Sequence, residues 1–258
     1  MMKISESIIL AAGLGDRLRP ISNVPKFAFK VHGLPLIAYP IGTMLSVGVR
    51  KFVIVVAKGY KELLDNILKR LHVEYVVVEN PYPRRGNGYS FLMTKDHVKS
   101  KLFYVSMCDH IYPPKVPLIL YKASLKTKAD IIVGADSKHP YIDIMEATKI
   151  LGDSENNVKS IGKELTEYNY VDIGVFIMSN NVYNVYDELI RLDNIRLVDV
   201  IAKAITLKLN VKLADIKGIP WTDIDTPDDL RELLEGERRE VLETYLREVE
   251  FESLKRLL

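Results

Sequence analysis

The sequence predicts an α/β fold in which a mainly parallel sheet has helices on both of its faces. Short runs rich in Ile and Val alternate along the chain with segments in which apolar residues recur every three or four positions. The run at residues 8–12 has no polar residue between its apolar ones, which is typical of a central strand buried on both faces. Strands and helices that alternate in this way form right-handed crossovers and a Rossmann-like sheet, with ligands beyond the carboxyl ends of the strands.

The individual elements follow from composition and spacing. The predicted strands are short β-rich runs bounded by turn residues, namely Ser7–Ala12, Lys51–Ala57, Val73–Glu79, Leu102–Met107, Ala129–Ala135, Val171–Met178 and Val211–Ile216. The predicted helices carry helical spacing of apolar side chains, namely Pro35–Val47, Tyr60–Leu71, Tyr89–Val98, Val116–Leu125, Asn181–Leu192 and Leu197–Leu207. Residues 137–170 fit neither pattern and are predicted to be an inserted segment on the substrate side.

Length and composition favour a soluble enzyme with one main core. The 258 residues are 48% hydrophobic, so we expect one domain at 1–236 and an amphipathic helix at 237–258. That helix could pack on its own domain or on a second copy in a homodimer. The net charge of +2 gives no overall field that would favour nucleic acid or an anionic membrane. A single cysteine favours a cytoplasmic location, and no apolar run reaches the roughly 18 residues of a membrane span.

The turn after the first predicted strand has the composition of a phosphate-binding site. Gly13 and Gly15 allow the backbone to approach phosphate oxygens closely, and successive N–H groups there can bind an anion. Arg17 and Lys26 add the positive charge that a leaving pyrophosphate requires. Leu18 stands where the dinucleotide fingerprint needs a third glycine, and the P-loop pattern is absent. The predicted nucleotide-binding residues of this turn are Leu10, Ala11, Ala12, Gly13 and Gly15.

Two acidic stretches point to a magnesium ion. Asp109 follows an apolar strand, where a carboxylate near phosphates suits Mg²⁺; the alternative is a helix N-cap. The stretch W-T-D-I-D-T-P at 221–227 also resembles a segment that supplies a second metal carboxylate in a known enzyme family, and this resemblance makes Asp225 the preferred second ligand and Asp223 the next. These two residues would face the same side of an extended segment. Asp225 or Thr226 could also cap a helix that begins at Pro227.

The stretch at residues 80–90 contains two prolines and two glycines and is predicted to be an ordered loop. Asn87 could be a plain turn residue, or its amide could read the edge of a pyrimidine. The resemblance of this stretch to a nucleotide-binding family motif implies nucleotide contacts from Asn87, Gly88 and Ser90. His110 could contact substrate or form a hydrogen bond within its own loop.

The string G-x-G-x-R-L-R-P at 13–20, followed by Pro25-Lys26, resembles the signature of the sugar-phosphate nucleotidyltransferases. Further segments resemble the archaeal CTP:inositol-1-phosphate cytidylyltransferases, namely G-N-G-Y-S at 86–90, M-C-D-H at 107–110, and the stretches at 141–149 and 161–174. The similarity extends over nearly residues 5–235. It implies the nucleotide-diphospho-sugar transferase fold and Mg²⁺-dependent transfer of CMP from CTP to inositol 1-phosphate.

The resemblance also implies roles for individual residues. Arg17 would neutralise the leaving pyrophosphate, Lys26 would lie between acceptor and α-phosphate, and Asp109 and Asp225 would hold the metal. The acceptor site implied by the motifs comprises Glu146, Lys149, Lys163 and Asp172, and His110 is a further candidate for contact with substrate. A separate membrane phosphotransferase would then consume the CDP-inositol. The alternatives are another acceptor, such as a hexose 1-phosphate or phosphocholine with CTP, UTP or GTP, or a non-catalytic homologue that binds nucleotide only to regulate.

Overall fold

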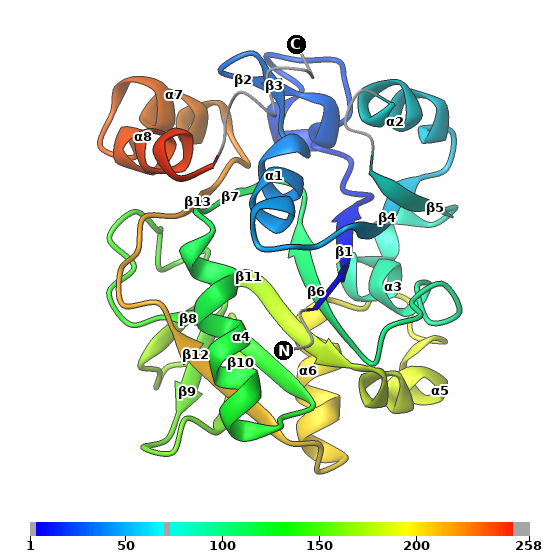
Figure 1. Cartoon of the computed structure of the whole chain (residues 1–258), viewed down its shortest axis with the longest axis vertical. Coiled ribbons are helices and arrows are strands. Elements are labelled where there is room, and N and C mark those ends of the chain that lie inside the picture. The colour runs from blue at the N-terminus through cyan, green and yellow to red at the C-terminus, as the bar shows by residue number, and fades with distance from the viewer. Residues whose placement is uncertain (1–3, 70–72, 250–258) are drawn as a thin grey trace.

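The computed structural model describes residues 4–69 and 73–249, and its centre is a mixed, mainly parallel sheet (Figure 1). The parallel strands β5, β4, β1 and β6 lie side by side; next comes β11, which is antiparallel to both β6 and β8, and then β8 and β12, which are parallel to each other. The predicted fold class is confirmed. These strands are β1 (Glu6–Ala11), β4 (Lys51–Ala57), β5 (Glu74–Asn80), β6 (Leu102–Met107), β8 (Ile131–Asp136), β11 (Tyr170–Ser179) and β12 (Val211–Asp215).

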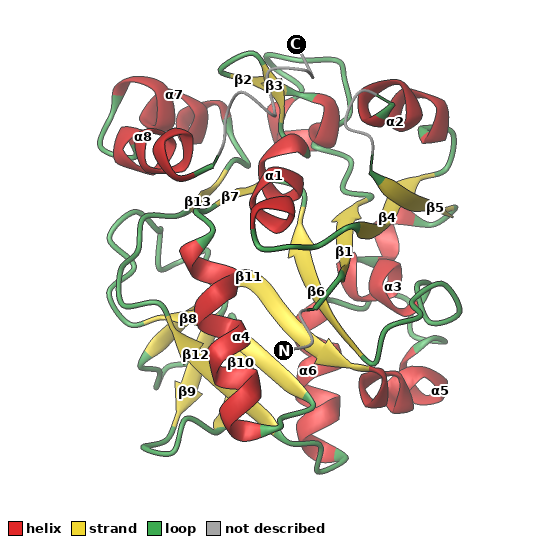
Figure 2. Ribbon diagram, in the orientation of Figure 1, coloured by secondary structure: helices red, strands yellow, loops and turns green. Residues whose placement is uncertain are grey.

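Helices cover both faces of this sheet (Figure 2). Successive residues of β1 point to opposite faces, so that Ile8 and Leu10 join one buried apolar cluster and Ile9 and Ala11 join another. The first cluster lies under α3 (Asn87–Leu92), α5 (Tyr186–Leu189) and α6 (Leu197–Thr206). The second lies under α1 (Ala38–Ser46), α2 (Lys61–Leu68) and α4 (Lys115–Thr127). The lack of alternation in the first strand therefore reflects burial on both faces.

Three sequence-based expectations differ from the structure. The segment 137–170 contributes β9 (Lys149–Gly152) and β10 (Val158–Gly162), an antiparallel pair that joins the sheet through β11. The helix expected at Tyr89–Val98 instead begins at Asn87, inside the predicted loop, because the N–H groups of Gly88 and Tyr89 find an acceptor in the Ile195 carbonyl. The helix expected at Asn181–Leu192 is a 3₁₀ segment at 180–185 followed by the single turn of α5.

Short strand pairs and two more helices lie beyond the carboxyl end of β6. They are β2 (Lys30–Val31) with β3 (Leu34–Pro35), β7 (His110–Ile111) with β13 (Thr222–Asp223), and the helices α7 (Pro227–Glu235) and α8 (Arg239–Glu248). The Tyr245 hydroxyl of α8 donates to the Tyr39 carbonyl of α1 at 2.9 Å. The described part of the C-terminal segment therefore packs on its own chain, whereas the expectation for residues 250–258 lies outside the described residues.

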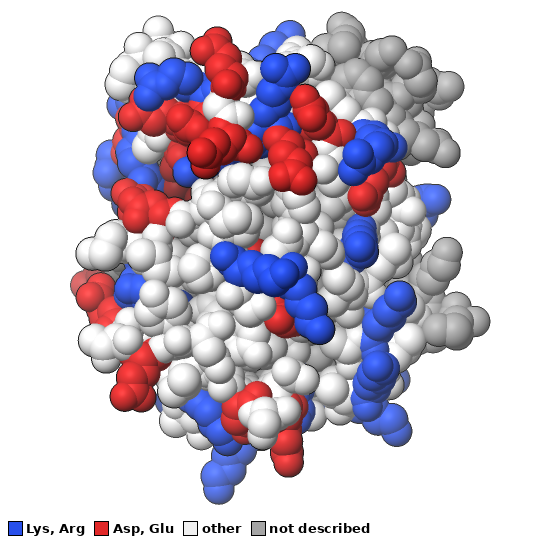
Figure 3. Space-filling model, turned by 90° about the vertical axis from the view of Figure 1, so that its left-hand side faces the viewer, with Lys and Arg blue, Asp and Glu red and all other residues white. Residues whose placement is uncertain are grey.

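The surface around α7 and α8 carries charges of both signs. Figure 3 shows acidic and basic side chains intermingled in the upper part of the face where these helices lie. Within the described ranges, no helix has the length and apolar character needed to cross a lipid bilayer.

Candidate active site

Two adjoining cavities open beyond the carboxyl ends of β1 and β6, where the sequence analysis placed the ligands. The smaller, of about 300 Å³, is lined by the glycine turn and its neighbours, including Gly13, Gly15, Arg17 and Lys26. The larger, of about 440 Å³, is lined by residues of β7, β13 and the 142–148 loop. Both cavities share the residues Asn87, Met107, Asp109 and Asp225. Two carboxylates thus lie on the wall between a glycine-lined cavity and an acid-lined one.

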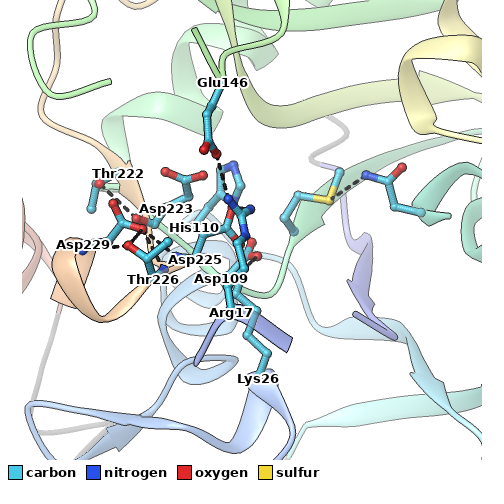
Figure 4. A network of polar contacts seen from close by, with 12 residues as sticks. Arg17, Lys26, Asp109, His110, Glu146, Thr222, Asp223, Asp225, Thr226 and Asp229 are labelled. Atoms are coloured by element: carbon cyan, nitrogen blue, oxygen red, sulfur yellow. Dashed lines mark hydrogen bonds and ion pairs between the residues drawn. The ribbon is translucent and has the colours of Figure 1, made fainter. Parts of the chain in front are cut away.

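Lys26 links the two carboxylates. Its Nζ contacts Asp109 Oδ2 and Asp225 Oδ1, and only 7% of the lysine side chain is exposed (Figure 4). Burial alone would lower the pKa of Lys26, but Asp109 and Asp225 outweigh that effect and raise it. Burial alone would raise the pKa of Asp109, yet Lys26 and His110 hold it well below its ordinary range. Lys26 and Asp109 are therefore both charged at neutral pH.

Gly15 allows the glycine turn to approach this lysine. Its φ is +66°, a conformation that residues with a side chain rarely adopt, and a Cβ there would lie 3.0 Å from Lys26 Cβ. By contrast, a Cβ on Gly13 would have no protein atom within 4 Å. The backbone conformation of Gly15 and its contact with Lys26 thus account for a glycine at position 15 without a ligand. At Gly13, by contrast, the space that a side chain would fill is open and adjoins the smaller cavity.

Arg17 spans the mouth of the site. It lies on the 3₁₀ turn at 16–18 and donates to Glu146 Oε2 at 2.7 Å and to Asp225 Oδ2. The arginine side chain is half exposed and that of Glu146 is 62% exposed, so the contact with Glu146 is screened by solvent. Figure 4 shows Glu146 pointing toward Arg17 from the opposite side of the site. Two cationic side chains, Arg17 and Lys26, thus meet at Asp225, and Arg17 also links it to Glu146.

His110 is held on three sides. Its Nδ1 lies 2.7 Å from Asp109 Oδ1, and its ring stacks on Trp221 with centroids 6.0 Å apart. Gly174 has a φ of +67°, and a Cβ there would lie 2.5 Å from His110 Nε2. The Trp221 indole donates in turn to the buried carboxylate of Asp136 at 3.0 Å. The ring orientation is therefore fixed, and it holds one oxygen of Asp109.

The family described as MobA-like NTP transferase domain matches residues 7–183, which is more than half of the chain. The chain belongs to this family. The predicted resemblance to nucleotidyltransferases, and with it the expectation of an enzyme of that class, is confirmed.

The chain is similar to several known proteins. It is 34% identical over 228 residues to "Bifunctional IPC transferase and DIPP synthase" of Aquifex aeolicus (strain VF5), covering 88% of this chain and 50% of that protein. It is also 34% identical over 230 residues to the protein of the same name from Archaeoglobus fulgidus, covering 89% and 43%. The chain thus spans about half the length of these curated relatives. The solved inositol-1-phosphate CTP transferase of T. maritima is 33% identical, with a TM-score of 0.85 over 96% of this chain and 98% of that chain.

The residues predicted to bind nucleotide in the NTP transferase divide into two groups. Leu10, Gly13, Gly15 and Asn87 line the smaller cavity. The amide oxygen of Asn87 accepts from Leu197 N–H at 2.8 Å and so also holds the start of α6. Ala11 and Ala12 are buried in the apolar clusters on the two faces of the sheet.

Two residues of the predicted nucleotide-contacting loop do not line the cavities of the NTP transferase. Gly88 donates its N–H to Ile195, and a Cβ there would lie 2.4 Å from the Arg196 carbonyl oxygen. Ser90 is 2% exposed, and its hydroxyl accepts from the Asn80 amide at 2.9 Å. Close packing between α3 and the segment before α6 explains both residues, so the structure gives them a role in the scaffold.

Most of the predicted acceptor residues lie around the larger cavity. His110, Glu146, Lys163 and Asp172 line it. Lys149 is not among the lining residues, because its Nζ donates to the Lys163 carbonyl at 3.2 Å and lies 5.6 Å from the Tyr168 ring centroid. Sequence reasoning did not predict several further lining residues, which are Ile142, Asp143, Thr148, Gly174, Trp221 and Arg238. Trp221 adjoins the acidic motif and could have been found there, whereas Arg238 lies beyond the predicted domain boundary and gave no signal.

The donor set fits a cation that is shared with substrate. Among the residues that the structure describes, no three His, Cys, Asp or Glu side chains are arranged to hold a metal without other ligands. Asp109 and Asp225 already direct oxygens at one cationic atom, Lys26 Nζ. Magnesium usually takes one or two carboxylates, with phosphate oxygens and water completing its octahedron. Asp223 lines the same cavity as Asp225, and burial raises its pKa.

Proposed function

We propose that the chain transfers CMP from CTP to inositol 1-phosphate, giving CDP-inositol and pyrophosphate. One observation carries the proposal: Asp109 and Asp225 lie on the wall shared by the glycine-lined and acid-lined cavities, beside Lys26. Nucleotide in the first cavity and acceptor in the second would bring the reacting phosphates together at that wall. The names of the T. maritima structure and the curated relatives support inositol phosphate and CTP as the pair.

The proposed chemistry needs no nucleophilic side chain. A phosphate monoester loses its second proton near pH 6, so the acceptor phosphate is largely dianionic at neutral pH. One of its oxygens forms a bond to the α-phosphorus while the bond from that phosphorus to the bridging oxygen breaks, and pyrophosphate leaves with that electron pair. Arg17 would neutralise the leaving group, and Lys26 would hold the acceptor and α-phosphate in line. Asp109 and Asp225, with Asp223 as the next candidate, would hold Mg²⁺, which supplies further charge neutralisation when bound.

The acid-lined cavity supports a polyol acceptor. Carboxylates accept hydrogen bonds from hydroxyl groups, and Glu146 and Asp172 line the cavity together with Lys163, which could meet the acceptor phosphate. We further propose that the reaction takes place in the cytoplasm and that a separate membrane phosphotransferase consumes the product.

A panel of substrate pairs tests the proposal. Pyrophosphate release would be measured for CTP, UTP, GTP and ATP, each with inositol, glucose, mannose and choline phosphates. CTP with inositol 1-phosphate is expected to give the highest kcat/KM. A faster reaction with another pair would replace the proposed acceptor or base. No release from any pair, with nucleotide binding retained, would favour a non-catalytic regulatory homologue.

The pH dependence of acceptor use should reveal Asp172. Burial raises the pKa of Asp172 to about 6, so its carboxyl is neutral below that pH and ionised above it. An ionised carboxylate accepts stronger hydrogen bonds from hydroxyl groups, so its contribution to kcat/KM should increase as the pH rises through 6, by roughly tenfold. Because the acceptor phosphate also titrates near pH 6, the quantity to measure is the ratio of wild-type to Asp172→Asn kcat/KM. A ratio that does not change with pH would remove Asp172 from the acceptor site.

A further inference from the structure

Arg238 connects the C-terminal helix to the acidic stretch of the site. It lies just before α8, and its Nη1 donates to Asp229 Oδ1 at 2.8 Å and to Thr222 Oγ1 at 3.1 Å. The side chains of Arg238 and Asp229 are each 17% exposed, so this ion pair is shielded from solvent more than the one at Glu146. The two contacts of Arg238 lie on either side of the segment that carries Asp223 and Asp225.

Asp229 connects Arg238 to the backbone of Asp225 through hydrogen bonds. Its Oδ2 accepts from the Asp225 N–H at 3.0 Å and from the Thr226 N–H at 2.8 Å. Thr226 is the N-cap of α7, and its hydroxyl also hydrogen-bonds Asp229 (Figure 4). Arg238 therefore holds one oxygen of Asp229 while the other oxygen fixes the amides at and after Asp225.

The position of Arg238 is itself fixed by the core. Val241, Leu242 and Tyr245 of α8 are buried in one apolar cluster with Leu18 of the glycine turn and Ile224 of the acidic stretch. The Tyr245 hydroxyl is bonded to α1, as described above. Arg238 also supplies the positive charge next to Asp229 in a cavity that Asp223 and Asp225 line as well. Arg238 therefore offsets the negative charge of Asp229 in a lining that already contains the carboxylates of Asp223 and Asp225.

We propose that Arg238 is a positioning residue, which fixes the Asp225 carboxylate through Asp229 and so makes the C-terminal helix a working part of the active site. This inference rests on the proposed function, in which Asp225 acts at the reacting phosphates. Residues that orient a metal-binding group through hydrogen bonds typically account for 10- to 100-fold in metal affinity or activity.

The test compares Arg238→Met and Arg238→Lys with the matched control Arg239→Met. Arg239 lies next along the chain, but its side chain is 64% exposed and pairs with Glu243 on the outer face of α8. Arg238→Met is expected to lower kcat about 10- to 100-fold and to weaken Mn²⁺ binding, measured by electron paramagnetic resonance, by a similar factor. Arg238→Lys should restore most of both, because a single nitrogen makes both native contacts. Arg239→Met should behave as wild type.

Hydrogen exchange separates this inference from the proposed function. The amides of Asp225 and Thr226 should exchange faster in Arg238→Met than in wild type or Arg239→Met, whether or not the right substrates are known. If the wild type is active and these amides exchange no faster in Arg238→Met, the positioning role is overturned and the proposed function stands. Faster exchange in Arg238→Met, together with a wild-type protein that turns over no substrate pair, would refute the proposed function alone. If Arg238→Met does not fold, Arg238→Lys decides, with Asp229→Asn as the comparison because it lacks the carboxylate that Arg238 holds. Amide exchange as fast and kcat as low in Arg238→Lys as in Asp229→Asn would contradict the positioning role, because the retained charge is expected to restore both.

Discussion

Replacing Lys26 by methionine is expected to lower pyrophosphate release from CTP by about 100- to 1000-fold. This is the scale on which removal of one preorganised donor reduces kcat, about 3 kcal/mol of barrier or more. Lys26 is buried and contacts both Asp109 and Asp225, so it is preorganised in this sense. The loss should fall on kcat more than on KM, because a charge that strengthens its contacts in the transition state is removed. Steady-state kinetics at saturating CTP measures it.

Lys30→Met is the matched control for Lys26→Met. Lys30 is exposed on β2 and lines neither cavity, so its removal should leave the rate unchanged. Lys26→Met also leaves two shielded carboxylates without their shared cation, which costs several kcal/mol of stability when a buried pair is broken. Added Mg²⁺ should therefore raise the melting temperature of Lys26→Met more than that of wild type. Near-normal turnover in a folded Lys26→Met variant would contradict the assignment.

Asp109→Asn is expected to reduce turnover by at least about 100-fold. An amide is a poor magnesium ligand compared with a carboxylate, and it is a weaker partner for Lys26 and His110. Because the side chain keeps its size, the variant should fold, and circular dichroism would confirm it. The variant should also bind Mn²⁺ more weakly than wild type when titrated in the presence of a nonhydrolysable CTP analogue.

Asp65→Asn offers the comparison for Asp109→Asn. Asp65 is on α2, where it pairs with Lys61 away from both cavities. Its substitution should affect stability by less than about 1 kcal/mol and leave metal binding unchanged. Retention of metal affinity in Asp109→Asn would show that the ion is held elsewhere.

The fold was predictable wherever the pattern was local. The strand at Lys51–Ala57 has the predicted bounds because a run of β-branched residues starts after a turn and ends before Gly59. By contrast, β9 and β10 were missed. Both are short: Lys149–Gly152 depends on pairing with β11, and Val158–Gly162 on pairing with Lys149–Gly152, and no local pattern records either contact.

The candidate site was partly predictable for a related reason. Asp109 and the glycine turn follow the ends of neighbouring parallel strands, so their proximity follows from topology. The meeting of Asp109 with Asp225 was expected only from the resemblance. Gly88 and Ser90 stand in a family motif, but their native contacts are with Ile195 and Asn80, residues that a motif cannot reveal. Arg238 was missed because its partners, Thr222 and Asp229, are tied to it by packing of α8.

A single wall between two cavities favours inhibitors that bridge them. A nonhydrolysable compound joining cytidine to a polyol through a bisphosphonate would place its phosphorus atoms beside Asp109 and Asp225 and fill both sides at once. Such a ligand loses its rigid-body entropy once, whereas two separate halves lose it twice. By the same reasoning, the proposed product CDP-inositol would bind in both cavities at once, and its release would require one of its two ends to dissociate first.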